Sequence, residues 1–215
     1  MELIIFDLDG TLIDSAPDLA ESVNHMLTKL GRKPFDEATI RSWVGNGAQM
    51  LVKRALSGSK DPKPLSQTFF KEALSIFLEH YEQNLVNKTT LYPGVKETLK
   101  SLSHKRLAIA TNKPERFVKP ILQKLGIDCF DVVVGGDSLH AKKPDPAMLH
   151  YILQKTCAKE ALMVGDSKND ILAAKNAGLP CVAVTYGYNQ GENLQSLKPD
   201  YTIDRFEELK EIVGV

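Results

Sequence analysis

Polar side chains able to do acid–base, metal or phosphate chemistry follow four short apolar runs in this sequence. They are Asp7 and Asp9 after the first run, Thr111 and Asn112 after the second, Lys143 shortly after the third, and Asp166 and Asp170 after the fourth. A single acid in such a place is usually a turn or helix cap, and a single lysine before a proline is usually solvated. Because the pattern recurs at four successive runs, it favours one shared site over separate caps.

The acids of this set need a cation among them. Two ionised carboxylates about 4 Å apart repel each other by about 4 kcal/mol at an effective dielectric constant of about 20. A hard divalent ion with oxygen ligands fits such a group best, and Mg²⁺ typically takes one or two carboxylates, water and a substrate phosphate. Lys143 adds a fixed positive charge. We therefore predict a Mg²⁺ site at which a phosphate group binds.

The apolar runs themselves are short and β-branched, as in strands that are buried on both faces. They span 3–6, 107–110, 132–134, 162–164 and 181–184, and helical patterns lie between them at 95–102, 114–125, 146–155 and 171–177. Alternating strands and helices predict an α/β fold with a doubly wound parallel sheet. In such a sheet the ligand crevice lies outside the carboxyl ends of the strands, which is where the polar residues fall.

Residues 16–86 follow a different pattern, with several amphipathic helices and no convincing strand. One helical stripe begins near Pro17 and is stopped by Gly31, and a long one runs from about residue 65 to Tyr81. We predict a small α-helical domain of residues 16–86, inserted after the first strand into a catalytic core of residues 1–15 and 87–215.

Charge and cysteine content exclude some classes of partner. Lys plus Arg and Asp plus Glu each total 27, and this zero formal charge argues against a general nucleic-acid or membrane-surface binder. The three cysteines are odd in number and far apart, which suits reduced thiols. No apolar stretch approaches the roughly 20 residues that cross a bilayer, and no signal peptide is expected. We expect a cytoplasmic protein, monomeric or homodimeric, that acts on a small phosphorylated metabolite.

Four stretches resemble the motifs of the haloacid dehalogenase superfamily. They are DLDGTL at 7–12, Thr111 ending the second strand, Lys143 before a proline, and GDSKND at 165–170. The resemblance spans the core, implies a Rossmann-like fold, and identifies the helical insertion as that superfamily's cap domain. It implies that Asp7 attacks phosphorus to form an aspartyl-phosphate and that Asp9 acts as general acid and then general base.

The same resemblance implies the remaining roles. Thr111 and Lys143 would hold the transferring phosphoryl oxygens, with Asn112 beside them. Mg²⁺ would be held by the Asp7 carboxylate, the Asp9 main-chain carbonyl and Asp166, with Asp170 binding it directly or through water. Asp9 favours fast hydrolysis, because the superfamily's ion pumps carry threonine there and its dehalogenases lack this acid.

Two further stretches are similar to the bacterial phosphoglycolate phosphatases within this superfamily. They are WVGNGA at 43–48 and TYGYNQGE at 185–192, and they imply hydrolysis of 2-phosphoglycolate. The cap would supply specificity: main-chain N–H groups at Gly45, Asn46 and Gly47 can approach an anion, and Arg41 can pair with a carboxylate. In the alternative interpretation, the Gly-Asn-Gly segment only joins two helices and Arg41 is a solvated surface residue.

Other functions remain open at this stage. Within the same class they are another small sugar-phosphate phosphatase or a β-phosphoglucomutase-like enzyme. From other classes they are a phospho-acceptor signalling domain, with a long-lived phosphorylated Asp7, and a non-catalytic binding protein on the same fold.

Overall fold

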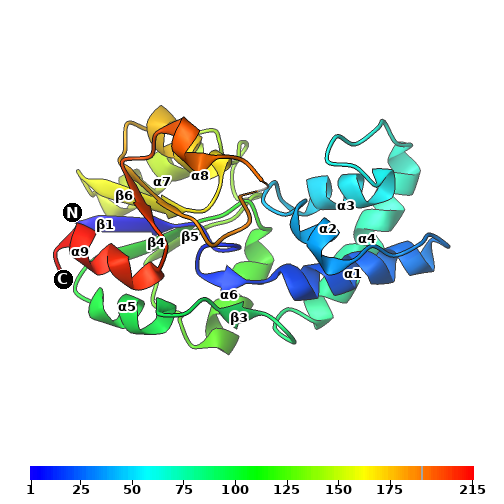
Figure 1. The fold of residues 1–215 in the computed structure, drawn as a ribbon, viewed down its shortest axis with the longest axis horizontal. Coiled ribbons are helices and arrows are strands. Elements are labelled where there is room, and N and C mark those ends of the chain that lie inside the picture. The colour runs from blue at the N-terminus through cyan, green and yellow to red at the C-terminus, as the bar shows by residue number, and fades with distance from the viewer. Residues whose placement is uncertain (190) are drawn as a thin grey trace.

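The computed structural model describes residues 1–189 and 191–215. Figure 1 shows a sheet flanked by helices and, beside it, a lobe made of the helices between residues 16 and 83. Both termini lie in the part that contains the sheet. The helical lobe corresponds to the insertion predicted at 16–86, and its status as a separate domain stays a prediction.

The six strands of the main sheet are all parallel to their neighbours. They are β1 (Leu3–Phe6), β4 (Arg106–Ala110), β5 (Val132–Val134), β6 (Ala161–Gly165), β7 (Cys181–Val184) and β8 (Tyr201–Ile203), in the order β5-β4-β1-β6-β7-β8. The α/β prediction is therefore confirmed, and the five predicted strands are found to within one residue at each end. The edge strand β8 was not predicted, because only one of its three residues is buried and it contains no apolar run.

Side chains alternate along the central strand β1, so each face of the sheet receives its own layer of helices. Leu3 and Ile5 pack with residues of α7 (Ala147–Thr156) and α8 (Lys168–Asn176). Ile4 and Phe6 pack with residues of α5 (Val95–Ser101), α6 (Glu115–Leu125) and α9 (Leu209–Val213). Short 3₁₀ turns at Leu194–Leu197 and Phe206–Glu208 complete the part of the chain around the sheet.

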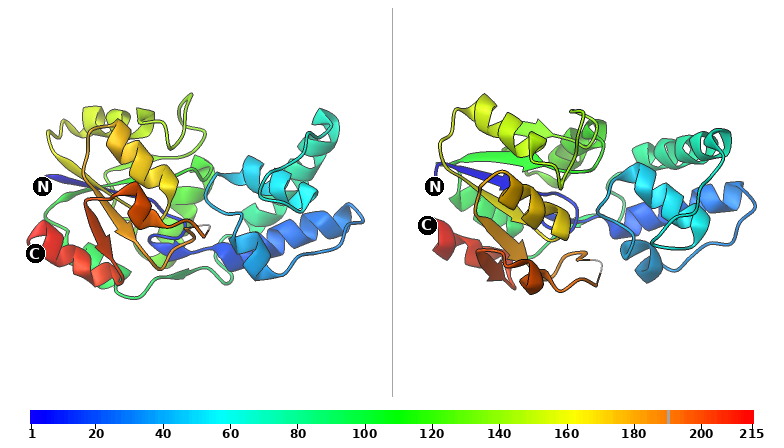
Figure 2. Two further views of the ribbon diagram at one scale, coloured as in Figure 1. Left: turned by 45° about the horizontal axis from the view of Figure 1, so that its top comes forward. Right: turned by 90° about the horizontal axis from the view of Figure 1, so that it is seen from above.

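The inserted helices are α1 (Ala16–Lys29), α2 (Glu37–Arg41), α3 (Ala48–Ser57) and α4 (Gln67–Gln83). Helix α1 packs on α4 through one hydrophobic cluster, which continues into the core beneath it. Figure 2 shows this helical group projecting beyond the sheet in two further views. None of the helices in the described ranges is long and apolar enough to span a bilayer.

Two chain connections join the helical lobe to the sheet, and they pair with each other. β2 (Ile13–Asp14) and β3 (Thr90–Leu91) form a two-stranded antiparallel sheet. Beside it, the buried Asp18 carboxylate accepts hydrogen bonds from the main-chain N–H groups of Asn87, Lys88 and Thr89 at 2.8–3.1 Å. The outgoing and returning connections are thus held together where they enter the cap.

Candidate active site

The loop after β1 places the first two acids at the carboxyl edge of the sheet. The Asp7 main-chain N–H donates to the Val164 carbonyl at 2.9 Å, which continues the strand pairing up to this residue. Gly10 follows with φ +90°, a conformation that favours glycine. A Cβ at Gly10 would also collide with the Asp166 carboxylate. The Asp-Gly-Thr turn therefore lets the β1 and β6 loops approach closely.

Three acids from two strand ends form one buried cluster. Carboxylate oxygens of Asp7, Asp166 and Asp170 lie within 4.8 Å of one another. The Lys143 ammonium nitrogen lies 2.9 Å from Asp7 Oδ1 and 2.6 Å from Asp170 Oδ1, and its side chain is 1% exposed. Residues up to 163 positions apart in the sequence are thus brought together around one cation, as the strand-end argument requires.

The two acids after β6 are oriented by the loops around them. Asp166 accepts hydrogen bonds from the Thr11 hydroxyl at 3.2 Å and from the Tyr188 main-chain N–H at 2.6 Å. Asp170 Oδ2 accepts from the main-chain N–H and the hydroxyl of Ser167, a capping box that starts α8. The other Asp170 oxygen faces Lys143. Each carboxylate is therefore fixed before any ligand binds.

The cluster holds more negative charge than one lysine neutralises. Burial raises the pKa of Asp7 from 3.8 to about 7, and the charges of Asp170 and Asp9 add to this effect while Lys143 opposes it. Burial, followed by the charges of Asp170 and Asp7, likewise holds the pKa of Asp166 well above its ordinary value. Buried carboxylate oxygens are the donors that Mg²⁺ and Ca²⁺ prefer, so this group fits a hard divalent cation.

Thr111 and Asn112 stand at the end of β4, beside the acid cluster. The Thr111 side chain is buried, and its oxygen accepts from the Lys113 main-chain N–H at 3.2 Å. The Asn112 side-chain amide donates to the main-chain carbonyls of Lys143 and of Gly45 at 3.1 and 3.2 Å. Asn112 therefore links the lysine loop to the cap.

The Gly45-Asn46-Gly47 segment of the cap lies over the core edge, where two of its carbonyl oxygens accept hydrogen bonds from core side chains. The Gly45 carbonyl accepts from the side-chain amides of Asn112 and Asn169, and the Asn46 carbonyl accepts from Lys142 Nζ at 3.1 Å. A Cβ at Gly47 would meet the Asn112 carbonyl at 2.7 Å, so glycine permits this close approach. The proposed N–H contacts to an anion stay a prediction.

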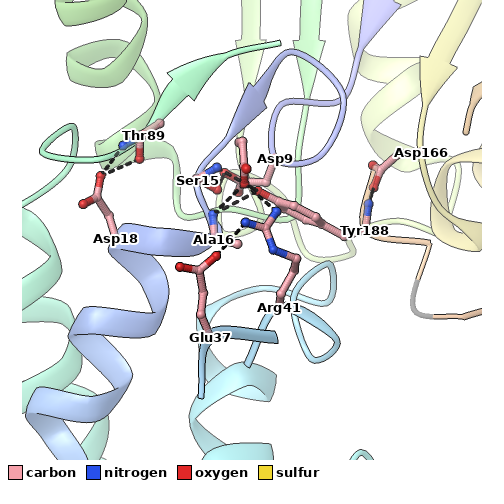
Figure 3. Close-up of polar contacts among 10 residues, drawn as sticks. Asp9, Ser15, Ala16, Asp18, Glu37, Arg41, Thr89, Asp166 and Tyr188 are labelled. Carbon is pink, nitrogen blue, oxygen red and sulfur yellow. Dashed lines mark hydrogen bonds and ion pairs between the residues drawn. The ribbon is translucent and has the colours of Figure 1, made fainter. Parts of the chain in front are cut away.

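Arg41 lies at the end of α2, near the start of the cap. Its guanidinium contacts Asp14 Oδ1 and Glu37 Oε1, both at 2.7 Å, and lies 5.3 Å from the ring centroid of Tyr188 (Figure 3). Its predicted role toward a substrate carboxylate is therefore not represented in this arrangement, where protein carboxylates occupy both ends of the guanidinium. That role stays a prediction.

Lys113 and Ser15 contact the second acid, Asp9, and neither is among the predicted site residues. Lys113 Nζ lies 2.9 and 3.1 Å from the Asp9 carboxylate oxygens. The Ser15 hydroxyl donates to Asp9 Oδ1 at 2.5 Å (Figure 3). Lys113 lies two residues beyond Thr111, at a bend that follows β4. This spacing places Lys113 near the site, whereas its contact with Asp9 depends on how the loops after β1 and β4 pack.

A small cavity lies between the acids and the cap. It has a volume of about 40 Å³, and its polar lining includes Asp7, Asp9, Thr111 and Lys113. Its apolar lining comes mainly from the cap and α6: Leu19, Val44, Ala48, Leu51, Phe77, Tyr81 and Phe117. The site is thus closed on one side by charged groups and on the other by apolar side chains.

Comparisons with known proteins agree on one family. Residues 4–184 match the model of the haloacid dehalogenase-like hydrolases. A phosphoglycolate phosphatase of Colwellia psychrerythraea is 52% identical over 214 residues, covering 97% of this chain and 95% of that protein. One of Pseudomonas fluorescens is 47% identical, covering 96% of this chain and 78% of that protein. The crystal structure of a predicted phosphoglycolate phosphatase from Haemophilus somnus has a TM-score of 0.93 and 42% identity, covering 99% of this chain and 98% of that one.

Proposed function

We propose that this chain, which belongs to the haloacid dehalogenase-like hydrolase family and is a phosphatase, hydrolyses 2-phosphoglycolate to glycolate and phosphate with bound Mg²⁺. The observation that carries the proposal is the contact of the Lys143 ammonium with Asp7 and Asp170, with Asp166 in the same buried cluster. This arrangement supplies a nucleophile, a cation for phosphate oxygens and a divalent-ion site within one small volume.

The metal role is assigned to the acids of the cluster. Mg²⁺ would be held by the Asp7 carboxylate, the Asp9 main-chain carbonyl and Asp166, with Asp170 binding directly or through water. When bound, Mg²⁺ neutralises charge on the carboxylates and on the substrate phosphate. The hydrogen bonds from Thr11 and Tyr188 fix the orientation of Asp166 for this role.

The chemical steps are assigned to the two acids after β1. The Asp7 carboxylate attacks phosphorus, the bond from phosphorus to the ester oxygen breaks, and Asp9 gives a proton to the leaving alkoxide. Asp9 then takes a proton from water, which attacks the aspartyl-phosphate and releases phosphate with Asp7 restored. Lys143, Thr111 and Asn112 hold the phosphoryl oxygens and keep the nucleophile in place.

The lining of the cavity supports 2-phosphoglycolate over a hexose phosphate. The cap presents mostly apolar side chains, including Leu19, Leu51 and Phe77. Sugar hydroxyls buried against such walls would lose hydrogen bonds to water without replacement. A two-carbon substrate brings no sugar hydroxyl and leaves fewer polar groups to bury against these walls.

The proposal also covers the domain organisation of the chain, its location in the cell and its oligomeric state. Residues 1–15 and 87–215 form the catalytic core, and residues 16–86 form a cap whose segment Gly45-Asn46-Gly47 and residue Arg41 help to select the substrate. Closure of the cap would exclude water from the aspartyl-phosphate until the hydrolytic water binds. The enzyme would work in the cytoplasm, as a monomer or a homodimer.

The test compares the native chain with Asp7→Asn on 2-phosphoglycolate and p-nitrophenyl phosphate, with and without Mg²⁺. We expect Mg²⁺-dependent turnover, higher kcat/KM for 2-phosphoglycolate than for hexose phosphates, and a loss of at least about 10³-fold in Asp7→Asn. Asp61→Asn, at an exposed acid in the cap, is the matched control. Retained turnover in Asp7→Asn would rule out Asp7 as nucleophile.

Rapid-quench experiments distinguish a phosphatase from a phospho-acceptor signalling domain. A phosphatase gives a phosphoenzyme that forms and decays within a turnover, whereas a phospho-acceptor signalling domain gives a long-lived phospho-Asp7 and little phosphate release. A better kcat/KM for hexose phosphates than for 2-phosphoglycolate would make the substrate assignment wrong and leave the phosphatase assignment standing.

A further inference from the structure

Lys113 lies just beyond β4 and carries a positive charge. The proposed reaction steps at Asp7 give this charge no role. The Lys113 side chain is 3% exposed, and its ammonium nitrogen lies 2.9 Å from Asp9 Oδ1. Burial acts to lower the pKa of Lys113, but the Asp9 carboxylate raises it above its ordinary value, so the side chain stays cationic at neutral pH. Burying a cation costs several kcal/mol, and contacts with anions are needed to offset this cost.

Tyr81 of α4 reaches the same ammonium from the cap. The ring centroid lies 4.7 Å from Lys113 Nζ, within the range of a cation–π contact. The Tyr81 hydroxyl is buried beside the Lys113 ammonium, which interacts with its oxygen, and its own proton has no acceptor among the described residues. Burial raises the pKa of Tyr81 to about 12, so its hydroxyl keeps its proton and can donate it to an acceptor. A ligand that accepts this hydrogen bond would remove the cost of an unpaired buried donor.

Both side chains line the cavity that also exposes Asp7, Asp9 and Thr111. Among the cavity's described lining residues, Lys113 carries the positive charge. A lysine ammonium has three N–H donors, and the Asp9 carboxylate has two oxygens, so at least one donor can serve a further acceptor. An anion placed in the cavity would therefore meet an ammonium from the core and a hydroxyl from the cap.

We propose that Lys113 and Tyr81 bind the carboxylate of the substrate and make the enzyme selective for small phosphate esters with a carboxylate one methylene group from the ester oxygen. The assignment rests on the proposed function, because Asp9 as general acid fixes where the leaving oxygen lies. The group attached to that oxygen then lies beside the Lys113 ammonium, which contacts Asp9 directly. In 2-phosphoglycolate this group is a methylene followed by a carboxylate.

Arg41 does not offer this contact in the present arrangement of the cap. Its guanidinium is held by Asp14 and Glu37 and does not belong to the lining of the cavity. Lys113, by contrast, is buried inside the site and lies on the core, so its position does not depend on cap closure. Tyr81 arrives with the cap, so the carboxylate would be held by both parts at once.

The test measures a preference for charge with matched substrates. 2-Phosphoglycolate is compared with 2-phosphoglycolamide, which has the same shape without the carboxylate charge, and with ethyl phosphate. For the native enzyme we expect kcat/KM to be about 100-fold higher for 2-phosphoglycolate than for the amide, because a desolvated charge pair is lost in the amide. The effect should appear mainly in KM.

Two variants report on the two proposed contacts. In Lys113→Met the preference for 2-phosphoglycolate over the amide should disappear, and in Lys113→Arg most of it should return. In Tyr81→Phe, which removes a hydroxyl whose proton has no acceptor among the described residues and should fold normally, the preference should fall about 10-fold, because a hydrogen bond to a charged group is lost. Lys119→Met and Tyr201→Phe, both at exposed positions, are the matched controls.

The outcomes separate this assignment from the proposed function. A native enzyme that hydrolyses 2-phosphoglycolate no better than ethyl phosphate contradicts the proposed function itself. A native enzyme that prefers 2-phosphoglycolate, with the preference kept in Lys113→Met and Tyr81→Phe, contradicts only the carboxylate site. An equal fall in kcat/KM for 2-phosphoglycolate and for the amide in Lys113→Met also contradicts the carboxylate site, because Lys113 would then act only through Asp9. If Lys113→Met does not fold, Lys113→Arg and Tyr81→Phe decide the question.

Discussion

The Tyr188 hydroxyl donates a hydrogen bond to Asp14 Oδ1 at 2.7 Å, across 174 positions of the sequence. The Tyr188 hydroxyl oxygen also accepts hydrogen bonds from the main-chain N–H groups of Ser15 and Ala16 at 2.7 and 2.9 Å (Figure 3). The Tyr188 main-chain N–H in turn donates to Asp166. One residue of the loop after β7 therefore connects the acid cluster to the point where the chain enters the cap.

Tyr188→Phe should destabilise the protein through this connection. The variant leaves the Ser15 N–H without its acceptor and leaves the Ala16 N–H only its longer contact with Asp14 Oδ1 at 3.4 Å, so we expect the free energy of unfolding to fall by about 1–3 kcal/mol. Urea denaturation measures this change, and Tyr201→Phe, at a tyrosine that is 47% exposed, is the control. Since Asp166 keeps its main-chain donor, Mg²⁺ binding should persist. Equal stability of the two variants would contradict this role for the Tyr188 hydroxyl.

Asp18→Asn should weaken the junction between cap and core. The Asp18 carboxylate is 1% exposed and accepts three main-chain N–H groups and the Thr89 hydroxyl. An amide has one acceptor oxygen instead of two and places an NH₂ group against donors, so we expect a loss of about 3 kcal/mol in the free energy of unfolding.

Limited proteolysis reports on the same junction. Cleavage near residues 84–90 should become faster in Asp18→Asn, because this segment is held to α1 by the Asp18 carboxylate. Glu21→Gln is the matched control, since Glu21 is exposed and pairs with Lys88 at the surface. A variant as resistant as the control would show that the connections are held together by other contacts.

The pH dependence of stability should reverse when Mg²⁺ is removed. The pKa of Asp7 is raised from 3.8 to about 7 in the metal-free fold. Between these values the native state binds more protons than the unfolded state, so the stability of the metal-free protein should fall as pH rises from about 4 to 7. Mg²⁺ binds the ionised carboxylates, so its stabilising effect should grow over the same range.

Thermal unfolding across this pH range, with a chelator or with excess Mg²⁺, measures both trends. Asp7→Asn should make the metal-free curve less steep, because this variant removes one of the two carboxyl groups whose pKa is raised and also removes the Asp7 charge that raises the pKa of Asp166. A metal-free Tm that rises with pH, or a slope in Asp7→Asn equal to that of the native chain, would contradict the assignment of the effect to Asp7.

Local patterns in the sequence were enough to predict the elements that carry the site. Apolar runs such as 3–6 and 181–184 are buried on both faces of the sheet, as their composition indicates. Because parallel strands end at one edge, the order of strands and helices also predicted that Asp7, Lys143 and Asp166 would meet. The edge strand Tyr201–Ile203 escaped prediction, since only one of its three residues is buried.

Sequence patterns alone indicate which segments are strands and helices and where polar groups end the strands, and these features indicate the α/β class and the acid cluster. The folded structure was needed to see that Lys113 faces Asp9, that Arg41 is held by Asp14, and that Tyr188 connects the cap junction to Asp166. The physical reason is distance along the chain. Burial patterns repeat within a few residues, whereas these contacts join segments up to 174 positions apart, and their partners depend on how loops and cap pack.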